Sequence, residues 1–255
     1  MKRLVFLLSI IAFMAVPSSS YALLGFGMEA AVGISQSTAS GEFNYKETTA
    51  IDLETNFGFD DTDDEEQMAR LKVYLPLIFP NLYYSHSQMK FTNAAGAAFQ
   101  YAGQTVTVGD STMLEIITND YGFFYEIPFV GLVSGGILAA EVGINVRELT
   151  INAEVAILEA TDFSVWIPQL YVSLKVDIPT IPVILQAEVK TLSIDEDNEC
   201  SSYTGRIRYN LPITLPIGDV FIAVGYTKDI YKIDAEDVIA DTEFETFFVE
   251  AGYTF

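Results

Sequence analysis

Cysteine, histidine and tryptophan are nearly absent from the sequence. Its 255 residues include one cysteine, one histidine and one tryptophan. An intrachain disulfide is therefore impossible, and Cys200 is either a free thiol or a link between two chains. His86 has no second histidine beside which it could bind a metal, so a histidine-based metal site is disfavoured.

Positive charge is also scarce. The chain has 13 lysines and arginines against 35 aspartates and glutamates, and its formal net charge is −22. Such acidity argues against a nucleic acid partner. Half of the residues are nevertheless hydrophobic, which argues against a disordered acidic chain. The apolar surface must therefore be buried in a core or in a membrane.

Beyond the N-terminal segment, no apolar run is long enough for a membrane helix, which needs about 20 residues. The first 22 residues, MKRLVFLLSIIAFMAVPSSSYA, combine a basic start, a shorter apolar run and the small-residue site SYA. This pattern predicts a cleaved secretory signal peptide at residues 1–22. The remaining residues, 23–255, have the length of one domain.

Apolar and polar residues alternate along this domain in segments of about ten residues, which are separated by turn residues. In RIRYN, for example, Arg206 and Arg208 fall on one face of a strand, whereas Ile207 and Tyr209 fall on the other. The pattern predicts an all-β fold, an antiparallel transmembrane up-and-down β-barrel of ten strands, with eight or twelve as alternatives. The predicted strands are 25–35, 67–76, 81–91, 114–126, 136–148, 165–177, 182–193, 202–212, 217–229 and 244–255.

Two further stretches, 97–108 and 150–159, are extended in character and form either hairpin arms above the membrane or additional strands. Pro168 lies early in the sixth predicted strand, so we expect that strand to begin later than residue 165, because proline lacks the N–H of a ladder hydrogen bond.

The connections between the strands alternate between two kinds. Short, proline-containing ones such as LPLIFP and IPTIP predict periplasmic turns, whereas long acidic ones predict external loops. The most acidic is DDTDDEE at 60–66, which lacks the glycine of a calcium-binding EF-hand loop. It is either a solvated loop or a weak site where divalent cations are shared with lipopolysaccharide phosphates. The candidate Ca²⁺ ligands are Asp60, Asp61, Asp63 and Asp64; no other metal or cofactor is expected.

Most basic residues fall on the polar faces of predicted strands, together with several glutamates. Because an arginine or lysine facing lipid costs about 2–4 kcal/mol, we expect these charges to face the lumen and to compensate one another there. A soluble sheet with a solvated polar face, or a lipocalin-like barrel, is the alternative. The predicted lumen network comprises Glu29, Arg70, Lys72, Glu126, Glu141, Arg147, Lys175, Glu188, Lys190, Arg206, Arg208 and Glu250.

The final residues, FFVEAGYTF, alternate most regularly of all. A barrel in lipid has to pair its last strand with its first, because lipid offers no hydrogen bonds to an open edge. One face of this strand should point to lipid, with its aromatic end at the periplasmic interface. That face comprises Phe247, Val249, Ala251, Tyr253 and Phe255.

Three stretches, 51–61, 75–87 and 140–149, resemble a family of small, uncharacterised proteobacterial outer-membrane β-barrel proteins. The chain departs from that family near its start, where Gly25 and Gly27 are separated and no tryptophan occurs. The resemblance implies integral location in the Gram-negative outer membrane, with lipid and lipopolysaccharide around the barrel. The C-terminal strand with its final Phe255 also resembles the signal that the barrel-assembly machinery recognises. No catalytic residues follow from the resemblance.

These observations predict a monomer with a structural or surface-interaction role, exerted through its acidic external loops, and with a lumen plugged by charged side chains. A narrow channel for small cationic solutes is the alternative. A lipid-modifying hydrolase is a third hypothesis, which would depend on His86. Its neighbours Ser85 and Ser87 should point to the opposite face of the strand, so they cannot form a Ser–His pair with it.

Overall fold

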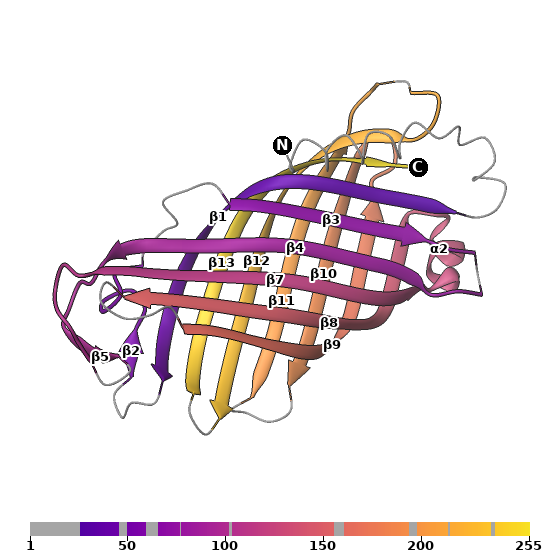
Figure 1. Cartoon of the computed structure of the whole chain (residues 1–255). Helices are drawn as coiled ribbons and strands as arrows, with labels where there is room; N and C mark the ends of the chain where they lie inside the picture. The colour runs from indigo at the N-terminus through magenta and orange to yellow at the C-terminus, as the bar shows by residue number, and fades with distance from the viewer. Residues whose placement is uncertain are drawn as a thin grey trace, which may run out of the picture.

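The computed structural model describes most of the chain beyond its N-terminal segment (Figure 1). The described residues are 26–45, 50–59, 66–76, 78–101, 104–155, 161–193, 198–213, 215–235 and 238–255. The predicted signal peptide at 1–22 and the candidate ligands Asp60, Asp61, Asp63 and Asp64 lie outside these ranges. In the described part, no helix is both long and apolar enough to cross a membrane.

Ten long strands form one closed antiparallel barrel, as predicted. Each strand pairs with the next along the chain, and the last, β13, pairs with the first, β1, from Glu29↔Thr254 to Tyr45↔Val238. The strands are β1 (Gly27–Tyr45), β3 (Glu66–Tyr74), β4 (Asn81–Ala94), β7 (Ser111–Glu126), β8 (Leu138–Val155), β9 (Thr161–Asp177), β10 (Val183–Ser193), β11 (Glu199–Asn210), β12 (Asp219–Ala235) and β13 (Val238–Thr254).

The strands are strongly tilted with respect to the barrel axis. Following directly opposed residues from Met28 through every strand leads back to β1 at Ser40, twelve positions further along. For ten strands this stagger corresponds to a tilt of about 40°, which lies within the usual range for barrels. The strong tilt is visible in Figure 1, where the strands of the two walls cross at a large angle.

Three short strands and one helix lie in the connections. β2 (Ile51–Asp52) pairs with β1. β5 (Phe99–Tyr101) pairs only with β6 (Gln104–Val106), so 97–108 is a hairpin arm that is not part of the barrel wall. Residues 150–155 belong to β8. The connections that contain β2, β5 and β6 are at one end of the barrel, here called the loop end (Figure 1). The single described helix, α2 (Pro128–Ser134), is at the opposite, turn end (Figure 1).

The expectation that the sixth strand begins late, because of Pro168, is wrong: β9 begins at Thr161. On the β10 side, the pairing ends at Leu170↔Thr191 before it reaches Pro168, although β10 itself continues to Ser193. The Asp177 amide donates to Ile137, on the β8 side, so amides at even positions of β9 point away from β8. The nitrogen of Pro168 thus faces a stretch without a ladder partner, where proline is tolerated.

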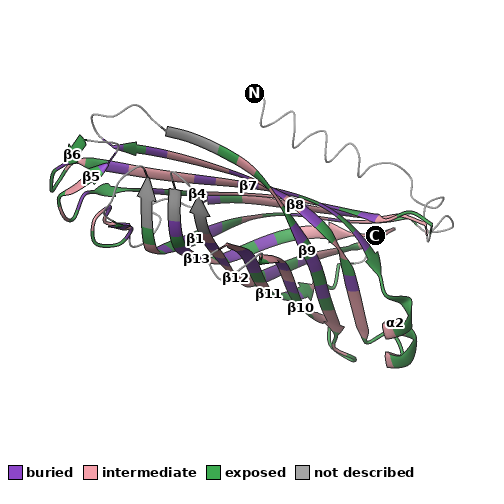
Figure 2. Ribbon diagram, turned by 90° about the horizontal axis from the view of Figure 1, so that it is seen from below, coloured by how far each residue is buried: buried purple, intermediate pink, exposed green. Residues whose placement is uncertain are grey.

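Polarity changes along the barrel axis. Toward the turn end the outer face is apolar, with side chains such as Val32, Ile144 and Val249 exposed, and the inner face is charged. An outward belt of aromatic side chains marks the end of this zone: Tyr84, Tyr121, Trp166, Tyr203, Tyr226 and Phe247, joined partly by ring contacts. Beyond the belt the outer face is polar and the interior is apolar. Figure 2 shows exposed and buried residues alternating along the strands.

Candidate functional site: the charged lumen and its apolar cap

The lumen holds three linked groups of charges. In the first, the Arg70 guanidinium on β3 contacts Glu29 on β1, and it lies 2.9 Å from Glu250 on β13. Arg206 and Arg208, on β11, complete the group by pairing with Glu250 at 2.9 Å and with Glu29 at 3.0 Å. Each glutamate therefore pairs with two arginines, and the group ties the first and last strands to β3, the neighbour of β1, and to β11, two strands from β13.

The second group centres on Lys72, which exposes none of its side chain. Its Nζ lies 2.7 Å from Glu141 Oε2 and 3.7 Å from Glu188 Oε2, and it donates to the Tyr171 hydroxyl at 2.6 Å. Lys175 approaches the other oxygen of Glu141 at 2.9 Å. The Glu141 carboxylate thus balances two ammonium groups, and Lys72 lies between two carboxylates.

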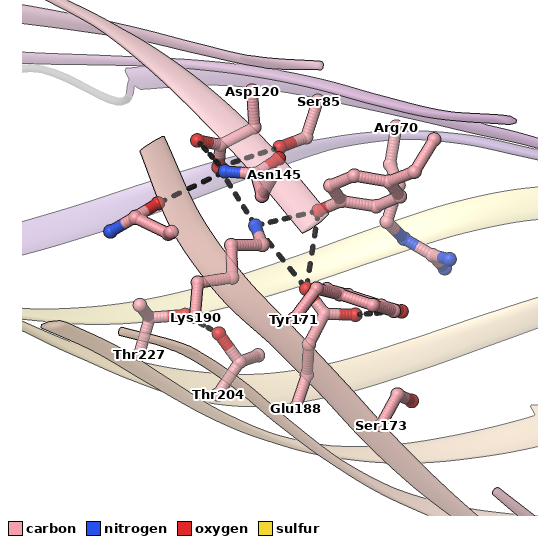
Figure 3. A network of polar contacts seen from close by, with 12 residues as sticks. Arg70, Ser85, Asp120, Asn145, Tyr171, Ser173, Glu188, Lys190, Thr204 and Thr227 are labelled. Atoms are coloured by element: carbon pink, nitrogen blue, oxygen red, sulfur yellow. Dashed lines mark hydrogen bonds and ion pairs between the residues drawn. The ribbon is translucent and has the colours of Figure 1, made fainter. Parts of the chain in front are cut away.

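The third group centres on Asp120, on β7 (Figure 3). Arg147 donates to both carboxylate oxygens of Asp120, at 2.9 and 3.0 Å, and also reaches Asp229 at 2.8 Å. Lys190 Nζ lies 2.7 Å from Asp120 and 3.3 Å from Glu188, which connects this group to the second. Such multiple pairing compensates buried charge that would otherwise be strongly destabilising.

Aromatic rings fill the space between the charges. Tyr83 and Tyr171 stack across the lumen with centroids 5.6 Å apart, and Phe124 lies 5.7 Å from Tyr171. Lys190 lies 4.6 Å from the Tyr83 ring centroid, which adds a cation–π contact. The three groups of charges and these rings are here called the charged layer. Its side chains, including those of Glu141 and Glu188, are almost wholly inaccessible to water.

The structure brings together eleven of the twelve residues predicted for this network. Glu126 does not join them: it lies at the last position of β7, directly opposed to Glu141 on β8, and is exposed. Sequence reasoning overlooked Asp120 and Asp229. Both have the parity of inward positions on their strands, but the inward aromatic residues Phe124 and Phe221 obscured the polar alternation there.

An apolar cluster fills the barrel interior at the loop end. The connection after β1 contributes Ile51, Leu53, Phe57 and Phe59 to it, although the acidic residues of this connection predict an external loop. Phe57 stacks on Phe59 at 5.2 Å, and Phe59 packs against Phe91 of the barrel wall. The full cluster, here called the apolar cap, is Ala39, Ile51, Leu53, Phe57, Phe59, Met89, Phe91, Ala95, Tyr101, Val106, Ile116, Leu149, Ala153, Val155, Cys200, Tyr231 and Phe244.

The β6–β7 turn above the cap is ordered by one aspartate. The amide and hydroxyl of Thr107 donate to Asp110 Oδ2 at 2.7 and 2.9 Å. These hydrogen bonds hold the pKa of the exposed Asp110 below its usual range. The turn therefore keeps its shape without contributing to the lumen.

His86 and its neighbour Ser85 lie on opposite faces of β4, as their spacing predicts. His86 Nδ1 lies 2.9 Å from Asn119 on the outer face, whereas its neighbour Ser85 donates to Asp120 in the lumen.

Cys200 is buried in the apolar cap as a free thiol that accepts a hydrogen bond from Gln169, so it is not presented for an interchain link. Among the described residues, no three His, Cys, Asp or Glu side chains cluster as metal ligands.

The two faces of the C-terminal strand follow its alternation. Phe247 and Val249 are exposed on the outer face, and Phe255 lies beside Tyr253 at the turn end. Phe255 and Met28 exchange two backbone hydrogen bonds of 3.0 Å, which continue the β1–β13 seam to its end.

Neither a protein-family model nor a curated protein matches the chain, so the family resemblance stays a prediction. Solved structures align with it at low identity. The attachment invasion locus protein Ail of Yersinia pestis, in complex with the heparin analogue sucrose octasulfate, is 9% identical; the match covers 91% of this chain and 99% of that one, with a TM-score of 0.38. The outer membrane protease OmpT from Escherichia coli is 9% identical over 91% and 96% of the two chains, with a TM-score of 0.42.

The translocator domain of the autotransporter NalP from Neisseria meningitidis is 10% identical over 90% and 88% of the chains, with a TM-score of 0.41. Likenesses at this level carry no conclusion about activity or ligand. The assignment of fold rests on the strand pairing itself: the chain is an all-β, closed, antiparallel barrel of ten strands, the architecture of outer-membrane barrels.

Proposed function

We propose that the protein is a monomeric integral outer-membrane barrel, closed to solutes, with a structural or surface-interaction role exerted through its acidic external loops. The observation that carries closure is the burial of the charged layer: Lys72 exposes 0% and Glu141 2% of their side chains. An aqueous pore would leave such groups in contact with water.

Barrel size supports the same conclusion. Eight strands enclose an interior that side chains fill, whereas 16–18 strands leave a channel. Ten strands are near the filled limit, and here long basic side chains and tyrosines occupy the space. The apolar cap adds a second barrier at the loop end, because ions would have to leave water to cross it.

Outer-membrane location is supported by the apolar outer zone and its aromatic belt, which are the features of barrels in lipid. The proposal includes no enzymatic activity, since His86 points away from the lumen and from Ser85. Lipid and lipopolysaccharide are the expected surroundings, and the barrel-assembly machinery is the expected insertion partner.

Conductance in planar lipid bilayers tests the closure. We expect the wild-type barrel to show no steady conductance at moderate voltage. The variant Tyr83→Ala/Tyr171→Ala, which removes the two stacked rings from the charged layer, should conduct measurably. A steady, large wild-type conductance with cation preference would overturn the proposal and favour the narrow cation channel.

The surface role is testable with a simple polycation. Vesicles that carry the wild-type barrel should retain poly-lysine, whereas a variant with Asp60, Asp61, Asp63 and Asp64 changed to asparagine should retain less. Added salt should weaken the retention, because salt screens the attraction between opposite charges in water. Equal retention by both proteins at low salt would argue against an interaction role for this loop.

A further inference from the structure

The four connections at the turn end contain no charged residue at all: 75–80, 127–137, 178–182 and 211–218. They nevertheless expose large apolar side chains. The most exposed lie in α2 and the β3–β4 turn: Leu132 and Ile78 each expose 79%, and Phe129 exposes 68%. Ile181 and Ile213 in the other two turns are about half exposed. Water-facing turns of a soluble protein rarely gather so much apolar surface.

The exposed turn residues are not parts of the core. α2 has no buried residue, and Figure 2 shows it as largely exposed at the turn end. Its apolar surface is continuous with the outer wall, since Tyr125 and Ile127 lead directly from β7 into α2 and are themselves exposed. The turns therefore extend the apolar zone of the barrel past the ends of its strands.

The height of the wall explains why such an extension is useful. From Phe247 in the aromatic belt to Thr254 at the end of β13 there are seven residue steps. At about 3.3 Å per residue and a tilt of about 40°, they span about 18 Å along the axis. The apolar band of a membrane barrel is about 25 Å tall, so the wall falls short by about 7 Å.

The shortfall is larger on β7. Tyr121 in the belt and Glu126 at the strand end are separated by only five steps, or about 13 Å along the axis. This is the strand that continues into α2, and a helix with its side chains is about 10 Å thick. The connection with the most apolar surface thus follows a strand on which much of the apolar height is missing.

We infer that the turns at this end, α2 included, are immersed in the acyl chains of the periplasmic leaflet and complete the hydrophobic height of the barrel. The occupant of the apolar surface is phospholipid. The absence of charge in all four turns fits this environment, and so do the prolines, which remove backbone N–H groups that lipid could not satisfy.

Single-tryptophan fluorescence in vesicles tests this inference. In a Trp166→Phe background, Leu132→Trp reports on α2 and Ile181→Trp on the β9–β10 turn. The matched control is Val108→Trp, because Val108 is a comparably exposed apolar residue, at 66%, in the β6–β7 connection at the opposite end. Unheated gel mobility verifies that each variant is folded.

Replacing phosphatidylcholine by its dibrominated analogue should quench the emission at positions 132 and 181 at least twofold, and should leave position 108 unchanged. Emission at 132 and 181 should also lie to the blue of that at 108. If both turn positions are quenched no more than position 108, the turns lie in water, free or covered by a protein, and the inference fails. This outcome is independent of whether the lumen conducts.

Discussion

Lys72 offers a direct measure of what the buried ion pairs contribute. Changing Lys72→Met keeps most of the side-chain volume and removes the charge that lies between Glu141 and Glu188. Breaking a buried pair by removing one partner typically costs about 3–5 kcal/mol, because the remaining charge is left uncompensated. We expect the free energy of unfolding to fall by about this amount. A loss of about 3 kcal/mol or more corresponds to at least a 100-fold change in the equilibrium constant of unfolding.

Lys228→Met is the matched control. Lys228 Nζ lies 2.7 Å from Glu243, the same separation as between Lys72 and Glu141, but the pair is exposed at the surface of β12 and β13. Exposed pairs are screened by water and contribute little. The two variants therefore differ mainly in burial, and we expect the control to unfold like the wild type.

The assay is equilibrium unfolding by urea in lipid vesicles, followed by the fluorescence of Trp166. The double variant Lys72→Met/Glu141→Gln should lose less free energy of unfolding than the two single variants together. Each single change leaves the partner charge buried and unpaired, whereas the double change removes both charges. Equal unfolding midpoints for Lys72→Met and Lys228→Met would refute the reasoning that burial makes the lumen pairs indispensable.

Two further predictions concern the β1–β13 seam and the turn between β9 and β10. Ser37 and Thr246 are directly opposed across the β1–β13 seam with their hydroxyl oxygens 2.9 Å apart, so Ser37→Cys/Thr246→Cys in a Cys200→Ser background should form an intrachain disulfide. A difference in gel mobility between reduced and oxidised samples would show the disulfide. Equal mobility under oxidising conditions would contradict the pairing of β1 with β13 at this position. Thr180 has a φ of 79°, which is strained for a β-branched residue, so Thr180→Gly should raise the free energy of unfolding by about 1 kcal/mol and Thr180→Val should not; equal unfolding of the two variants in urea would contradict this.

The strands and their faces were predictable because a two-residue period is a local signal. Each predicted strand overlaps an observed one, and the orientation of Arg206 and Ile207 follows from parity alone. The strand ends were harder, since β1 and β8 continue past the predicted boundaries into the loop end, where the polarity of the two faces is reversed. A rule that expects charge inside and apolar residues outside fails in that zone.

The apolar cap was not predictable in the same way. Phe57 and Phe59 directly precede the acidic run at 60–66, in a connection that its charges predict to be an external loop, and their burial depends on contacts with distant residues such as Phe91. Pro168 illustrates the same limit, because its tolerance in β9 depends on where the pairing with a different strand, β10, ends. Both features result from tertiary arrangement, which a single segment does not encode.

The first group of lumen charges joins residues that are very far apart in the chain. Arg70 meets Glu250, and Arg208 meets Glu29, only after the initial strand has found the final one. During biogenesis the growing sheet would therefore carry bare ions that require hydration, and hydrocarbon cannot supply it. Entry into the bilayer and sealing of the cylinder should then occur as one coupled event, with no long-lived half-inserted intermediate.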